Sequence, residues 1–259
     1  MPANEEGLPG TATNPYQTPS ASLIPPPLSA DRERQGPYGP FINTAGLSRV
    51  VVGLVLICAI LEVIIAIVSG FELSLLKSGG ADAYLEGETH SWLLLAIGGS
   101  AILWLILYLV TVVAFSKWII RSSKNAWLFA HQSGQRTMTI TPGWAVGYFF
   151  IPIINLWKPY TAMREIRDAT DASLLRSILP FWWTAWILSS VIGQISFRLG
   201  NKADTVESYI TSSVFDLATL PVSIVLTVLA IQLVRDMTRG QLERAGIETE
   251  KSTDRLRSH

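Results

Sequence analysis

Apolar residues gather in four long runs along this chain of 259 residues, and polar stretches separate the runs. The runs cover 50–68, 92–115, 177–197 and 212–234. A hydrocarbon core about 30 Å thick needs roughly 20 mostly apolar residues in a helix, and each run is close to that length. Only closed backbone hydrogen bonding survives in lipid, so the runs predict four transmembrane helices and an all-α membrane protein.

Helical spacing continues past the second run and predicts an extension of that helix along the membrane surface. Over 115–131 one side is apolar or small and the other is basic. The first side holds Phe115, Trp118, Ile119, Ser122, Ala126 and Phe129, and the second holds Lys117, Arg121, Lys124 and His131.

A short helix is predicted further along the chain, from Pro159 to Thr170. Proline suits the first position of a helix, because its missing N–H would have had no partner there. Arg164 and Asp168 are then spaced as an i,i+4 surface pair.

Residues 142–158 are too apolar for an ordinary loop and too interrupted, by Pro142 and Pro152, for an ordinary spanning helix. Eight Lys and Arg residues lie between the second and third runs, whereas the other two connectors hold one and two. Cytoplasmic loops carry the excess of Lys and Arg, so the central linker and both termini are predicted to be cytoplasmic. A crossing at 144–157 would place basic clusters on opposite faces. We therefore expect a re-entrant or interfacial broken helical segment at 142–158, with a fifth span as the alternative.

Composition divides the chain into three parts. Residues 1–48 are rich in Pro, Gly, Ser and Thr, which predicts a disordered cytoplasmic tail. Residues 49–236 form the predicted four-helix transmembrane domain, and 237–259 form a charged cytoplasmic tail.

Glu62 is the one ionisable residue near the middle of a predicted span. Intramembrane carboxyl groups are costly and often functional, so Glu62 could belong to an ion or proton path. The alternative is a protonated carboxyl group that donates a hydrogen bond to a polar residue at its depth. The residues at that depth are Ser100, Ser189 to Gln194, and Thr219.

A second group of polar candidates surrounds the broken segment. Asn155 could cap its interrupted backbone, and Arg121, Asn125 and Glu165 could form a polar cluster against Asn155. The same groups would serve either as a binding site or as hydrogen-bonding support for a broken segment.

The spacing of residues around this segment resembles a bacterial multi-pass membrane family, known as domain of unknown function 4328. The resemblance rests on KWIIRSSKNA and TPGWAVGYFFIPIINLWKPYTAMREI, and with the flanking runs it covers roughly 50–235. It implies a multi-pass helical architecture and no established activity. The residues that carry it include Trp118, Pro142, Trp144, Pro152, Trp157 and Pro159.

The sequence favours a non-enzymatic role. Its histidines are scattered and its single Cys58 lies in the first run, so no catalytic, metal or cofactor site is predicted. We expect a scaffold, assembly or regulatory component of the bacterial inner membrane. A small transporter or channel that uses Glu62 and the broken Pro142–Pro159 segment is the alternative. Expected partners are the bilayer and its anionic headgroups, and protein partners or further copies of the chain, but not nucleic acid.

Overall fold

The computed structural model describes residues 36–77, 88–134, 138–170, 175–201 and 206–246, and within them the protein is helical, with no named strand. The long helices are α2 (Ala45–Lys77), α4 (Glu88–Gln132), α7 (Leu175–Gly200) and α8 (Val206–Arg244). The shorter elements are α5 (Pro142–Gly147), the 3₁₀ turns η1 (Tyr148–Phe150) and η2 (Ile154–Leu156), and α6 (Lys158–Thr170). The all-α prediction is confirmed.

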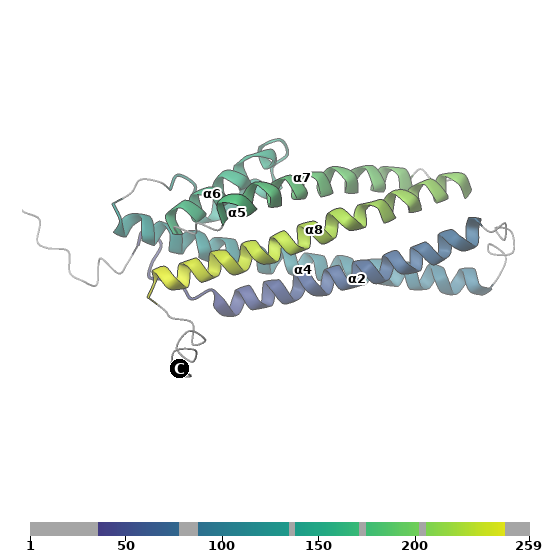
Figure 1. The fold of residues 1–259 in the computed structure, drawn as a ribbon, viewed down its shortest axis with the longest axis horizontal. Coiled ribbons are helices and arrows are strands. Elements are labelled where there is room, and N and C mark those ends of the chain that lie inside the picture. The colour runs from purple at the N-terminus through teal and green to yellow at the C-terminus, as the bar shows by residue number, and fades with distance from the viewer. Residues whose placement is uncertain (1–35, 78–87, 135–137, 171–174, 202–205, 247–259) are drawn as a thin grey trace, which may run out of the picture.

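The four long helices lie side by side, while α5 and α6 gather at one end of them (Figure 1). Helix α8 packs between α7 and α2, and α4 packs on the other side of α2. Each long helix contains one segment that is long and apolar enough to cross a membrane. These segments are Ala45–Phe71, Gly98–Gln132, Ile178–Gly200 and Ser213–Arg244, in agreement with the four predicted runs.

Helix α4 confirms the predicted extension of the second run but not its predicted course. Its 45 residues span about 67 Å at 1.5 Å per residue, roughly twice the thickness of a hydrocarbon core. The predicted apolar side is turned inward, with Trp118, Ser122 and Phe129 buried, whereas Lys117 and Arg121 are exposed. The extension is therefore packed inside the protein and does not lie as a separate helix on a membrane surface.

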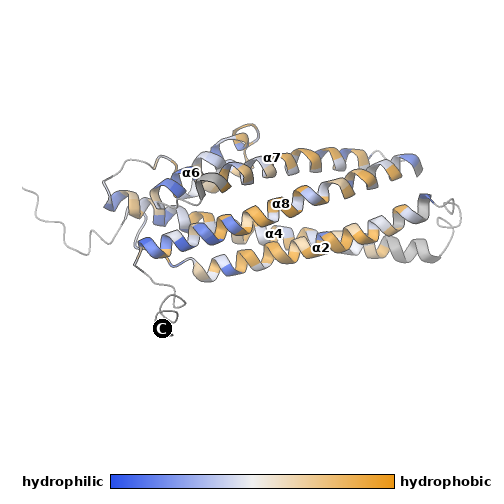
Figure 2. Ribbon diagram, in the orientation of Figure 1, coloured by the Kyte–Doolittle hydropathy of each residue, from blue (hydrophilic) through white to orange (hydrophobic). Residues whose placement is uncertain are grey.

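The buried core sits at one end of the bundle, which we call the base. It comprises the start of α2, residues 114–130 of α4, the start of α7 and the end of α8, together with α5 and α6. Beyond the base the long helices expose large apolar side chains, such as Ile67, Ile102 and Phe197, at 63–70% of their surface. Figure 2 shows hydrophobic residues along the length of these helices and hydrophilic ones toward the base. Such a continuous apolar exterior is typical of a surface that lipid covers.

Both predicted tail boundaries lie inside the folded part of the chain. Residues 36–44, which we call the strap, pack against α4, whereas 1–35 lie outside the described residues. Helix α8 continues past residue 236 to Arg244, and Met237 and Gln241 are fully buried. The helical core therefore takes in residues that composition alone assigns to both tails.

Candidate functional site

Asn125 joins the strap to the base. Its side chain is fully buried, and its Oδ1 accepts a hydrogen bond from the Ile42 N–H at 2.8 Å. Its Nδ2 donates to the Ile42 carbonyl at 2.8 Å and to Gln241 Oε1 at 3.1 Å. The Asn125 side chain thus satisfies the backbone N–H and carbonyl of Ile42 and the side-chain oxygen of Gln241 on α8.

Gln241 and Trp118 extend this network between α4 and α8. Gln241 Nε2 donates to the Ser122 carbonyl at 2.9 Å, and Trp118 Nε1 donates to Thr238 Oγ1 at 3.0 Å. All four residues are buried, so each of these hydrogen bonds replaces a hydrogen bond to water that is lost on folding. The two helices are fastened side chain to side chain as well as by apolar packing.

The strap itself fits closely over α4. Tyr38 meets the edge of Trp127 with ring centroids 5.5 Å apart, and Phe41 packs on Phe129 at 6.0 Å. A Cβ atom at Gly36 would lie 2.7 Å from the Leu128 Cα, so only glycine allows this approach. The strap then enters α2, where Asn43 Oδ1 accepts from the Ala45 N–H at 2.9 Å and so satisfies a donor of the first turn.

Glu165 of α6 holds the start of the segment that leads into α5. Its carboxylate accepts hydrogen bonds from the N–H groups of Thr139 and Ile140, at 2.9 and 3.0 Å, and from the Thr139 hydroxyl. On the other side, Trp127 Nε1 donates to the Ile140 carbonyl at 3.0 Å. Glu165 is only 9% exposed, and these donors compensate for the removal of its carboxylate from water.

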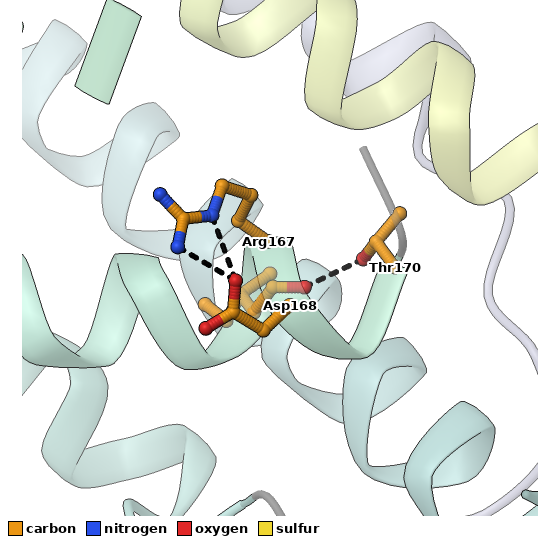
Figure 3. A network of polar contacts seen from close by, with 4 residues as sticks. Arg167, Asp168 and Thr170 are labelled. Carbon is orange, nitrogen blue, oxygen red and sulfur yellow. Dashed lines mark hydrogen bonds and ion pairs between the residues drawn. The ribbon is translucent and has the colours of Figure 1, made fainter. Parts of the chain in front are cut away.

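Arg167 and Asp168 form an ion pair near the end of α6 (Figure 3). Arg167 Nε and Nη2 both donate to Asp168 Oδ1, at 2.9 and 2.6 Å. The predicted Arg164–Asp168 pair is wrong, because Asp168 pairs with the adjacent Arg167 instead. The Thr170 hydroxyl, also shown in Figure 3, donates to the Ile166 carbonyl at 2.7 Å within the helix.

Residues 148–157 form a loop between α5 and α6, which we call the aromatic loop. At its tip Ile153 has φ 70° and ψ −58°, and the Ile154 N–H donates to the Pro152 carbonyl at 2.8 Å. This geometry is the rare γ-turn with positive φ, which is strained for any residue with a Cβ. The prediction of a broken segment is confirmed, and the structure has no fifth long helix in 138–170.

Aromatic side chains fix the loop to α7. Trp183 Nε1 donates to the Leu156 carbonyl at 3.1 Å, and Trp183 stacks on Trp186 at 4.8 Å. Phe149 meets both rings edge-on, at 6.2 and 5.8 Å. Figure 1 shows the loop beside α7, at the end of the bundle where α5 and α6 lie.

The predicted cluster of Arg121, Asn125 and Glu165 against Asn155 is not assembled. Among the described residues no hydrogen bond or ion pair links any two of these side chains. Asn125 and Glu165 serve separate parts of the base, and Arg121 is exposed. Asn155 Oδ1 is buried and has no hydrogen-bond partner in the described part of the chain, so it does not cap the broken backbone.

The motif residues take different positions around the base. Trp118 is in the buried network, and Pro142 and Pro159 are buried in the first turns of α5 and α6. The remaining three are solvent-facing in the isolated chain. They are Trp144, which stacks on Tyr148 at 5.2 Å, Pro152 at the start of the γ-turn, and Trp157 at the end of the aromatic loop.

Glu62 lies between two spans, away from the base. Its carboxyl group interacts with the Ser223 hydroxyl of α8, one helical turn from the expected Thr219. Asp216, also on α8, lies near Ser196 of α7, but the Ser196 hydroxyl has no hydrogen-bond partner among the described residues. The hydroxyls of Ser190 and Thr219 bond to carbonyls of their own helices, at 2.8 and 2.7 Å. Ser190 and Thr219, both expected in the polar belt, therefore bond within their own helices, and Glu62 meets Ser223 instead.

Sequence reasoning missed Gln241 and the strap. Gln241 had a detectable signal, since Leu233, Met237 and Gln241 continue one helix face at intervals of four residues. Ile42 offers no such signal, because it takes part through its backbone alone.

These features define an all-helical protein with four helices able to span a membrane, closed at one end by a buried polar network. Residues 88–239, more than half of the chain, match the family model of the domain of unknown function DUF4328, and the chain belongs to that family. The match begins with α4, so it includes Asn125 and Glu165 but neither α2 nor the strap. Searches of curated proteins and of solved structures gave no match.

Proposed function

We propose that this protein is a non-enzymatic scaffold, assembly factor or regulator in the bacterial inner membrane. The proposal rests on what the buried polar side chains bind. Asn125, Gln241 and Glu165 all bind the chain's own backbone, and together they fasten the strap, α4, α6 and α8 into one base. A base held in this way suits the presentation of a fixed surface better than chemistry on a bound substrate.

In the proposed orientation the base faces the cytoplasm, and both termini lie on that side. Lys117, Arg121 and Arg235 are exposed around the base, where they would meet anionic headgroups. The excess of Lys and Arg in the central linker supports the same orientation. Protein partners, or further copies of the chain, would bind at the base.

Isolation of the protein with its native lipids tests the scaffold role. Particles extracted by a polymer that preserves the surrounding bilayer should contain a partner, or further copies of the chain, in fixed stoichiometry. Asn125→Ala, which loosens the base, should lower that occupancy several-fold, whereas Val191→Ala on the exposed side of α7 should leave it unchanged. Particles holding one chain and lipid alone would contradict the proposal.

A small transporter or channel is the second candidate. The observation that favours it is the contact of the Glu62 carboxyl group with Ser223, between two spanning helices. Purified protein in liposomes should then carry a proton or cation flux that Glu62→Gln abolishes. Glu207→Gln, at an exposed position in the first turn of α8, is the matched control. Equal flux in the wild-type protein and Glu62→Gln would remove this candidate.

A further inference from the structure

The aromatic loop leaves the base and returns to it. Before the loop, Glu165 and Trp127 hold residues 139–140 to α6 and α4. After it, α6 begins at Lys158 and packs on α4. The chain therefore enters and leaves this excursion at the same end of the bundle.

The loop lies level with the first turns of a spanning helix. Its contacts on α7 are Trp183 and Trp186, and the apolar segment of α7 begins at Ile178. Trp186 is eight residues further on, about 12 Å along the helix. One leaflet contributes about half of a 30 Å hydrocarbon core, so a membrane surface level with Ile178 would place the loop within the depth of a single leaflet.

The loop turns its apolar side chains away from the protein. Phe150 is 67% exposed, Ile153 72%, Leu156 55% and Trp157 48%. Helix α7 also exposes apolar side chains at the same level, including Phe181 and Leu188 on the face turned away from the loop. The loop and α7 thus both turn large apolar side chains outward at this level of the bundle.

The second half of the loop pairs its backbone donors within the loop. The N–H groups of residues 154 to 157 donate to the carbonyls of Pro152, Ile151, Ile153 and Ile154, at 2.8–3.3 Å. The Leu156 carbonyl accepts from Trp183 Nε1. Irregular backbone at membrane depth needs this internal pairing, because lipid offers no partner.

Ile153 is the residue that the protein's own packing explains least. The strained γ-turn would suit glycine, which has no Cβ to clash at positive φ. The chain places a β-branched residue there, and its side chain contributes little to the interior because it is mostly exposed. The environment that favours an isoleucine side chain here is therefore one outside the protein itself.

We propose that the aromatic loop is inserted into the acyl chains of one leaflet, the one on the side of the base, with Ile153 at its tip. Lipid acyl chains are its ligand, and the loop settles as a shallow re-entrant segment. This inference rests on the proposed membrane location of the four long helices.

Depth-dependent quenching tests the insertion. Single cysteines carrying a fluorescent label are placed at Ile153 and Phe150 in a Cys58→Ser background, and the protein is reconstituted into nanodiscs. Val191 of α7 and Arg164 of α6 provide control positions, both exposed in the isolated chain. The quenchers are nitroxides on the headgroup or at two acyl-chain depths, and aqueous iodide.

Labels at Ile153 and Phe150 should be quenched best by the shallow acyl-chain nitroxide and at least fivefold less by iodide than the label at Arg164. Quenching by iodide equal to that at Arg164 overturns the proposal. Labels shielded from lipid and iodide alike, with cross-linking between chains at Ile153, would assign the loop to a second copy and also overturn it. The label at Val191 distinguishes failure of the proposed membrane location from failure of loop insertion. Iodide quenches this label only if the long helices are not embedded in the membrane.

Discussion

Asn125 shows how much one buried amide can hold. It binds the N–H and the carbonyl of Ile42 and the side chain of Gln241, and so joins three parts of the sequence, its own included. Loss of one member of such a set leaves the others buried without partners, which costs more than the bond itself contributes.

Asn125→Ala should therefore lower the free energy of unfolding by about 2–4 kcal/mol. Reversible unfolding by denaturant in detergent measures the change. Ser122→Ala is the matched control one turn earlier on α4, because the Ser122 hydroxyl is buried with no partner in the described residues. Its removal should be neutral or slightly stabilising, and an equal loss in both variants would contradict the role given to Asn125.

Glu165 acts on two backbone amides rather than on a cation. Glu165→Ala should accelerate hydrogen exchange at Thr139 and Ile140 by about 10–100-fold, equivalent to about 1.4–2.8 kcal/mol. Glu165→Gln keeps one acceptor oxygen and should fall between the wild-type protein and Glu165→Ala. Arg164→Ala, an exposed neighbour, should leave both amides unchanged. If both amides exchange at the wild-type rate in Glu165→Ala, the hydrogen bonds from Thr139 and Ile140 to Glu165 do not hold this segment.

At the scale of elements, the aromatic loop combines a strained turn with firm aromatic attachment to α7. The positive φ of Ile153 costs about 1–3 kcal/mol, and the loop keeps it because both flanks are fixed. Burial of an isoleucine side chain in an apolar phase returns about 1.5–3 kcal/mol. The two magnitudes are similar, so the apolar environment proposed for the tip is sufficient to offset the strain.

The strain can be measured by comparing two variants at one site. Ile153→Gly should be more stable than Ile153→Ala by about 1–2 kcal/mol, because both lose the side chain and only alanine keeps the clash. At Val191, inside α7, the order should be reversed, with alanine favoured by about 1 kcal/mol. Thermal unfolding in the same detergent compares the four proteins. The same order at both sites would contradict the γ-turn.

The elements differ in how far the sequence predicts them. The long helices and the two faces of α4 follow from apolar length and spacing, which leave a signal at every turn. The break at 142–158 follows from Pro142 and Pro152. The strap and the route of the aromatic loop do not follow, because they depend on contacts such as Ile42 with Asn125, 83 residues apart, and Leu156 with Trp183. Such contacts leave no periodic pattern in the chain.

At the scale of the whole molecule, the two ends of the bundle are built differently. The base has a packed interior with hydrogen-bonded polar groups, whereas the far part consists of helices whose apolar side chains mostly face outward. The base therefore folds on internal contacts, and the far part depends on an apolar surrounding for much of its burial.

The arrangement predicts the sidedness of three exposed positions. In a Cys58→Ser background, cysteines at His131 and Arg164, both at the base, should react with an impermeant maleimide from the same face of the membrane. A cysteine at Asn201, just past the far end of α7, should react only from the opposite face. Labelling of His131 and Arg164 from opposite faces would require a crossing between them and would contradict the fold in a membrane.

The aromatic loop has a consequence for the bilayer as well as for the protein. With the loop inserted, one leaflet must make room for four helices and a loop, and the other leaflet for four helices alone. The protein then occupies a larger cross-sectional area in one leaflet than in the other, and this difference favours local curvature of the membrane. The lateral distribution of the protein would follow the shape of the membrane, and shortening the loop would weaken that preference.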